Sequence, residues 1–68
     1  MHNIFMNRLK ELRVEAGYTQ KELAEKLNMS QTGYSKYETY ENDIPTKILI
    51  YLAELYGESV GYLLGVEH

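Results

Sequence analysis

The sequence predicts an all-α domain of five short helices. Apolar side chains recur at helical spacing in both halves of the chain, and residues that begin or end helices stand between these stretches. The 68 residues are expected to form a single domain over residues 1–68. A chain of this length buries only about 60% of the surface that its unfolded form exposes. Helix packing, with or without dimerisation, therefore has to supply the stability.

The first helix is expected to begin near Asn3 or Asn7, since either Asn can cap it, and to end at Ala16. Gly17 follows, and it can take the left-handed conformation found after many helix ends. The charged side chains from Arg8 to Glu15 are expected on a solvated face. The apolar face has the spacing i, i+4, i+7, i+11 and consists of Phe5, Leu9, Leu12 and Ala16.

Two more helix starts, Thr19 and Ser30, lie 11 residues apart. Thr19 is an N-cap whose capping box is completed by Glu22, and Ser30 is a second N-cap. Asn28 ends the first of these helices, because Asn tolerates the left-handed conformation. The helices are expected over about residues 20–27 and from residue 31 to residue 38 or 39. A break of about three residues favours a helix-turn-helix, in which the helices cross at roughly 90–120°.

The second helix of this motif has an outward face without an acidic residue. Gln31 stands at its N-terminal end, where an amide can present a donor and an acceptor together to adenine in the major groove. This is where the motif carries its recognition helix. Tyr34, Tyr37 and Tyr40 form a ladder that either stacks bases, as in single-strand binding, or packs in the core. The outward face consists of Gln31, Thr32, Ser35 and Lys36.

The stretch from Thr19 to Glu38, with Gln20, Glu22-Leu23-Ala24, Ser30-Gln31 and Tyr34-Ser35-Lys36-Tyr37-Glu38, resembles the phage-repressor-like (Xre/Cro-type) helix-turn-helix family. The similarity extends from Arg8 to Gly65. It implies a compact five-helix, lambda-repressor-like DNA-binding domain with the motif at about residues 19–38.

The resemblance also implies roles for single residues. Gln31, Thr32 and Lys36 would contact bases. An ion pair between Arg13 and Glu38 would tie the first helix to the third. Gln20 would contact phosphate and brace Gln31, while Lys21 is either a further phosphate contact or a solvated side chain. The phosphate candidates together are Gln20, Lys21, Ser30, Tyr34 and Ser35.

Four positions depart from the family pattern. Gly33 either lets the backbone approach DNA or the preceding helix closely, or is drift. Tyr40 stands where relatives carry Gly, so either the turn differs or a strained left-handed Tyr is accepted. Glu41 and Asp43 are expected to weaken phosphate binding by this loop, which runs from Thr39 to Ile44.

Pro45-Thr46 opens the fourth helix, because Pro is tolerated in a first turn. Gly57 ends that helix, Ser59 caps a short fifth helix over residues 60–64, and Gly65 stops it. Ile48, Leu49, Leu52, Ala53 and Leu55 form the apolar face of the fourth helix. Tyr51, Tyr56 and Tyr62 give more aromatic surface than two short helices can hide. This surface predicts a dimer contact made by Tyr62, Leu64 and Val66.

The net charge of −3 is unusual for a nucleic-acid binder. Charge near the DNA decides the attraction to phosphate, because screening removes much of the interaction beyond about 10 Å. Glu54, Glu58 and Glu67 belong to the C-terminal third and are expected to lie away from DNA.

Composition excludes several other classes. The chain has no Cys, and its His residues are His2 and His68, so neither a metal site nor a cofactor is expected. No phosphate-binding loop or set of catalytic groups is present, so an enzyme is not expected. The longest apolar run, residues 48–53, is too short to span a membrane, and no signal peptide precedes the domain. A cytoplasmic protein is expected.

The function predicted is a sequence-specific regulator that binds double-stranded DNA. It is expected to act as a repressor and to bind a two-fold operator as a homodimer. The alternative is a protein-interaction module, antitoxin-like, on the same fold with weak or no DNA binding.

Overall fold

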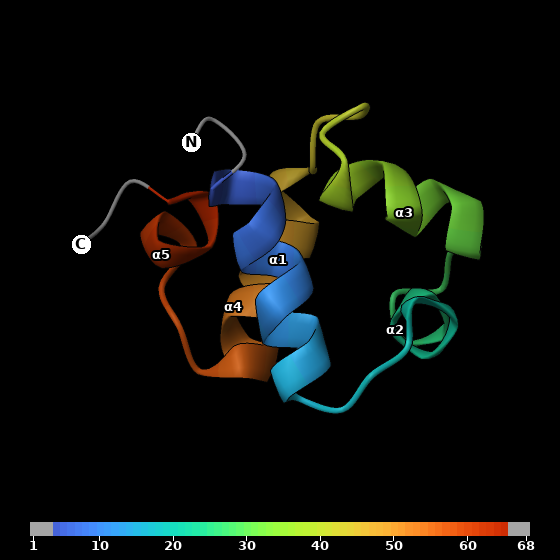
Figure 1. Ribbon diagram of the computed structural model, residues 1–68, viewed down its shortest axis with the longest axis horizontal. Helices are drawn as coiled ribbons and strands as arrows, with labels where there is room; N and C mark the ends of the chain where they lie inside the picture. The colour runs from blue at the N-terminus through green and yellow to red at the C-terminus, as the bar shows by residue number, and fades with distance from the viewer. Residues whose placement is uncertain (1–3, 66–68) are drawn as a thin grey trace.

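The computed structural model describes the backbone of residues 4–65 and the side chains of residues 8–65. These residues form five α-helices and no strand. Figure 1 shows α1 through the middle of the molecule, α2 and α3 on one side of it, α5 on the other, and α4 passing behind α1. The predicted five-helix, all-α fold is confirmed. The helices are α1 (Ile4–Glu15), α2 (Gln20–Lys26), α3 (Gln31–Glu38), α4 (Thr46–Tyr56) and α5 (Val60–Leu64).

Three helices, α2, α3 and α5, begin at the capping residues that the sequence predicts. Thr19 Oγ1 accepts a hydrogen bond from the Glu22 N–H, and the Glu22 side chain accepts one from the Thr19 N–H, so the capping box is complete. Ser30 Oγ accepts from the Gly33 N–H, and the hydroxyl of Ser59 caps α5 in the same way. These bonds satisfy N–H groups that the first turn of each helix leaves without a partner.

The first three helices end in left-handed residues. Gly17, Asn28 and Tyr40 have φ values of 87°, 61° and 61°. The backbone bonds around each are those of a Schellman motif. After α3, for example, the N–H of Tyr40 donates to the Tyr37 carbonyl at 3.2 Å and that of Glu41 to the Lys36 carbonyl at 3.0 Å. The strained alternative at Tyr40 is therefore the one adopted, at a cost of roughly 1–2 kcal/mol.

The core lies where the helices meet and consists mainly of leucine and tyrosine. Ala16 is exposed, so its predicted place in the core is wrong: α1 ends at Glu15, and Ala16 belongs to the turn that follows. The side chain of Phe5, and the whole of Asn3, lie outside the described residues, and Asn7 lies inside α1 rather than at its start. The largest fully buried side chains are Leu9, Leu23, Tyr34, Leu52 and Leu63.

Arg8 joins the two ends of the domain. Its Nη1 donates to the Tyr62 carbonyl at 2.6 Å, and its guanidinium lies 4.1 Å from the centre of the Tyr62 ring. A cation over an aromatic face adds roughly 0.5–2 kcal/mol to such a contact. The prediction that Arg8 belongs to a solvated face is therefore wrong, because α5 returns to pack beside α1.

Candidate nucleic-acid interface

The outward face of α3 forms one side of a shallow hollow. Gln31, Thr32 and Lys36 are exposed, and Ser35 is half-buried beside them. The N-terminal end of α2 and the loop after α3 complete the lining with Gln20 and Glu41. The hollow thus gathers amide, hydroxyl, ammonium and carboxylate groups on one surface.

A buried carboxylate lies at the end of α3, next to this hollow. Glu38 accepts hydrogen bonds from Arg13 Nε at 2.6 Å and Nη2 at 3.3 Å, from the Tyr34 hydroxyl at 2.6 Å and from Gln20 Nε2 at 3.0 Å. Arg13 also donates from Nη1 to the Tyr18 carbonyl at 2.9 Å. The ion pair between Arg13 and Glu38 that the resemblance implies is thus present and connects α1 to α3.

The partners of Glu38 fix its charge state. Burial raises the pKa of the Glu38 carboxyl, but the hydrogen bonds from Arg13, Tyr34 and Gln20 together outweigh it and hold that pKa below its ordinary value. The hydrogen bond to Glu38 raises the pKa of Arg13, and burial followed by the bond to Glu38 raises the pKa of Tyr34. At neutral pH the pair is therefore fully ionised, and the acid of α3 is neutralised inside the domain.

Tyr34 cannot contact a phosphate. Its side chain is completely buried, and its hydroxyl is held by Glu38. The predicted phosphate contact is therefore wrong, because Tyr34 lies one helical turn before Glu38 on the inward face of α3. Tyr37 is also buried and meets the Tyr34 ring edge to face, with the centroids 6.2 Å apart. Both rings belong to the core rather than to a base-stacking surface.

Gln20 links the buried network to the hollow. Its Nε2 donates to Glu38 Oε1 at 3.0 Å, a bond that the sequence did not predict, since the two residues are 18 positions apart. The expected brace was Gln31, which lines the same hollow. An amide nitrogen carries two N–H groups, so the bond to Glu38 leaves Gln20 one further donor and its oxygen.

Lys21 and Ser30 are exposed at the edges of this surface. Neither lines the hollow, and Ser30 uses its oxygen to cap α3. Gly33 lies half-buried at the first turn of α3, where an added Cβ would come within 3.1 Å of Met29 Cε and of Ser30 Oγ. The close approach at Gly33 is therefore to the turn between the helices, not to the helix before it.

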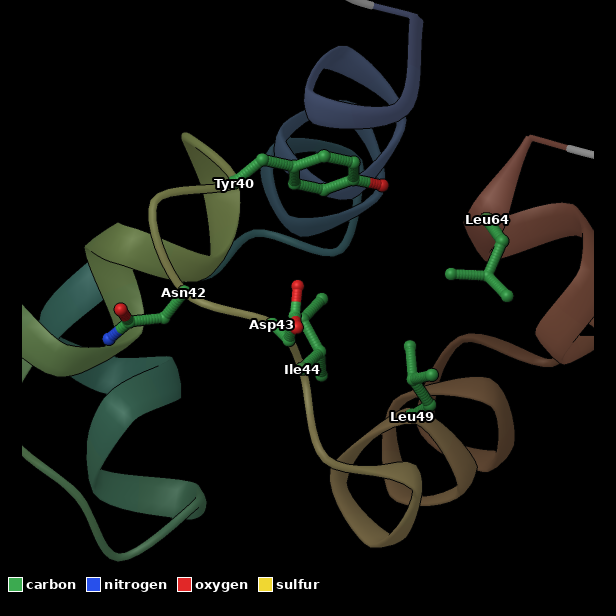
Figure 2. A pocket seen from close by; sticks show the side chains of 6 residues that line it. All are labelled: Tyr40, Asn42, Asp43, Ile44, Leu49 and Leu64. Carbon is green, nitrogen blue, oxygen red and sulfur yellow. The ribbon is translucent and has the colours of Figure 1, made fainter.

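The two acids of the loop after α3 line different hollows. Glu41 lines the hollow of the α3 face. Asp43 belongs to an apolar hollow that Ile44 and Leu49 also line, and Figure 2 shows Tyr40 and Leu64 on opposite sides of it. The two carboxylates therefore lie in different surroundings, although they are close together in the sequence.

The residues expected in a dimer contact are only partly accessible. Leu64 is half-buried and lines the apolar hollow, while Tyr62 is half-buried with Arg8 against its ring. Val66, like Glu67, lies outside the described residues. Among residues 4–65, no helix is long and apolar enough to cross a membrane, and no group of three His, Cys, Asp or Glu side chains could hold a metal ion.

Comparison with known proteins connects this geometry to a family. The HTH-type transcriptional regulator ImmR of Bacillus subtilis (strain 168) is 53% identical over 58 residues, which are 85% of this chain and 46% of that protein. The uncharacterized HTH-type transcriptional regulator YobD of the same organism is 36% identical over 63 residues, 93% of this chain and 56% of YobD. The SPbeta prophage-derived uncharacterized regulator YonR is 35% identical over 65 residues, 96% of this chain and 60% of YonR.

The chain spans about half the length of these curated relatives. A family model described as helix-turn-helix matches residues 9–63, which include all of α2 to α4. The relatives are named as regulators, which agrees with the prediction that the chain is not an enzyme. These matches agree with the capped helices α2 and α3 and with the exposed polar face of α3. The chain therefore belongs to the Xre-type helix-turn-helix family of DNA-binding transcriptional regulators.

Proposed function

We propose that this chain binds a specific double-stranded DNA sequence, and that it acts as a repressor by occupying a two-fold operator as a dimer. The observation that carries the proposal is the exposed face of α3. Gln31, Thr32 and Lys36 line one hollow there, while the acid of the same helix, Glu38, is buried and paired with Arg13. A face with free donors and acceptors can match the edges of base pairs in the major groove.

Each side chain of this face suits a definite contact. The amide of Gln31 can bond adenine N6 and N7 together, and the ammonium of Lys36 can donate to guanine O6 and N7. The hydroxyl of Thr32 both donates and accepts, so it suits more than one base. Gln20, Lys21, Ser30 and Ser35 surround these residues and would bond phosphate oxygens, which fixes the register of the protein on the duplex.

The acidic balance of the chain is compatible with this function because of where the acids are. Glu54 belongs to the last turn of α4 and Glu58 follows that helix, and Figure 1 shows α4 running behind α1 and ending on the side away from α2 and α3. Charges separated from the phosphates by more than about 10 Å are largely screened at moderate salt.

A dimer would bring two copies of α3 to successive major grooves, about 34–36 Å apart. Leu64 supports a contact near α5, since it lines an apolar hollow with Ile44 and Leu49. Tyr62 is the second described residue proposed for this contact, and Val66 is the third residue that the sequence suggests for it. Sedimentation equilibrium of the free protein and of its DNA complex tests the dimer. A monomer mass for the free protein at up to tens of micromolar, together with one protein chain per duplex in the complex, would exclude the dimer.

The main experiment is selection of bound sequences from random duplex DNA, followed by titration of the selected duplex at several salt concentrations. We expect two inverted half-sites and an affinity that falls steeply with salt, because bound phosphates release counterions. Gln31→Ala should lose the base preference at one position of each half-site. Lys47→Ala, which removes an exposed cation from α4, is the matched control and should behave as the wild type.

A protein-interaction module is the second candidate, and the apolar hollow beside Tyr40 and Leu64 favours it. Two variants distinguish the candidates. If Lys36→Ala leaves DNA binding unchanged while Tyr62→Ala abolishes a complex with a protein partner, the interaction module is the better account.

A further inference from the structure

The chain folds back after α3 and brings Glu41 to the hollow on the outward face of α3. Tyr40 takes the left-handed conformation with φ 61°, and the Glu41 N–H then donates to the Lys36 carbonyl at 3.0 Å. Glu41 therefore lies beside the last turn of α3 and lines the same hollow as Gln31, Thr32 and Lys36.

The carboxylate of Glu41 is also held in place. Thr39, the C-cap residue of α3, donates from Oγ1 to Glu41 Oε1 at 2.9 Å. The same hydroxyl faces the carbonyl oxygens of Lys36 at 3.3 Å and Ser35 at 3.5 Å, so Glu41 is the nearest of its three acceptors. A carboxylate has about four lone-pair sites, so one bond from Thr39 leaves most of its acceptor capacity for another donor. Fixing a long side chain in this way lowers the entropy that a further contact would cost.

Few groups of duplex DNA can satisfy such a carboxylate. Phosphates repel it, and guanine presents only acceptors, N7 and O6, in the major groove. Adenine has the N6 amino group, but the acceptor N7 lies next to it and would repel the second oxygen. Cytosine presents its N4 amino group as a donor without an adjacent acceptor of its own, and acidic side chains accept from it.

We propose that Glu41 is a specificity-determining residue that accepts a hydrogen bond from the N4 amino group of a cytosine at one position of each half-site. This inference rests on the proposed function, since it adds a further reader to the same face. It also gives a reason for the strained Tyr40, because residues held in rare backbone conformations cluster at functional sites.

The test compares three proteins in selection from random duplex DNA: the wild type, Glu41→Gln and Asp43→Asn. Glu41→Gln retains an oxygen for the Thr39 hydroxyl but replaces the carboxylate by an amide. Asp43→Asn is the matched control, because it removes the same charge from the same loop but from the apolar hollow. Both residues are exposed, so neither change should unfold the domain.

We expect the wild type and Asp43→Asn to enrich cytosine at one shared position of the half-site. Glu41→Gln should lose this preference, with the ratio of affinities for cytosine and its replacements falling by about tenfold. If Glu41→Gln and Asp43→Asn both keep the wild-type base profile and bind every duplex more tightly, Glu41 only repels phosphate and the inference is overturned. If the wild type enriches no sequence at all, the proposed function fails and this inference with it.

Discussion

Replacing Glu38 by Gln should destabilise the domain more than any exposed substitution of the same kind. The change keeps the size of the side chain but removes its charge. Arg13, which is 8% exposed, would then hold a buried cation without a counterion. The new amide nitrogen is a donor, so it cannot accept the bonds that a carboxylate oxygen takes from Arg13, Tyr34 or Gln20.

The size of this effect follows from the burial of both partners. Glu38 is 6% exposed, and Tyr34 is completely buried. Removing one partner of a buried ion pair costs about 3–5 kcal/mol. A domain of 68 residues is stabilised in total by roughly 3–10 kcal/mol, at about 0.05–0.15 kcal/mol per residue. We therefore expect Glu38→Gln to remove a large part of the stability and to populate the unfolded state at room temperature.

Urea denaturation followed by circular dichroism measures this loss. With an m value of about 1 kcal/mol/M for a small domain, the midpoint should fall by about 3 M or the folded baseline should disappear. Glu25→Gln is the matched control, since Glu25 is exposed on α2, and it should change stability by less than about 0.5 kcal/mol. A loss below about 1 kcal/mol for Glu38→Gln would refute the assigned role of the buried network.

Three further predictions concern stability. The partners of Glu38 hold its pKa below the ordinary value of 4.5, so the carboxylate stabilises the fold above that pH, and this stabilisation is lost as the pH falls through the lower pKa of the folded state. The difference in urea midpoint between the wild type and Glu38→Gln should therefore shrink from pH 7 to pH 3. An equal difference at both pH values would contradict this. Tyr56→Phe should raise the thermal midpoint, because the Tyr56 hydroxyl is the one buried side-chain polar atom of the described residues without a hydrogen-bond partner, and burial raises its pKa to about 12; a lower midpoint would show that the hydroxyl is satisfied. Thr19→Ala should cost about 1 kcal/mol and lower the thermal midpoint, since it removes the hydrogen bond that Thr19 Oγ1 accepts from the Glu22 N–H; an unchanged midpoint would mean that this bond does not fix the start of that helix.

The start and end of α2 and the start of α3 could be predicted because they depend on local chemistry. Thr19 and Ser30 cap their helices through bonds to N–H groups three residues away, and Asn28 ends α2 in the left-handed conformation. Such interactions join residues that are close together in the sequence. The choice at Tyr40 could not be made in this way, because the strain of a left-handed Tyr depends on what the rest of the fold offers in return.

Contacts between distant segments were harder to predict. Arg8 was expected in solvent, but it binds Tyr62, 54 positions away. The burial of Tyr34 and its bond to Glu38 turn a proposed phosphate contact into part of the core. Helical spacing gives the face on which a side chain lies, but not which partner meets that face. The ion pair of Arg13 and Glu38 was expected only because of the resemblance to a family.

The positions of the two acidic side chains in the loop after α3 could not be predicted from the sequence either. In the sequence, Glu41 and Asp43 form one acidic pair that weakens phosphate binding. In the fold, the two side chains line separate hollows, one polar and one apolar. Glu41 and Asp43 are two residues apart in an irregular loop, so the directions of their side chains depend on the turn at Tyr40 and on the start of α4. The base contacts of Gln31, Thr32 and Lys36 remain predictions, as does the dimer.

Duplex DNA is expected to meet the outward face of α3. Mapping of NMR chemical-shift changes on adding the selected duplex tests it most directly. We expect the side-chain amide of Gln31 and the backbone amides of Thr32 and Lys36 to shift most. The backbone amides of Ile50 and Tyr51, which are exposed on α4, should stay unchanged. Shifts centred on α4 with α3 unaffected would contradict it.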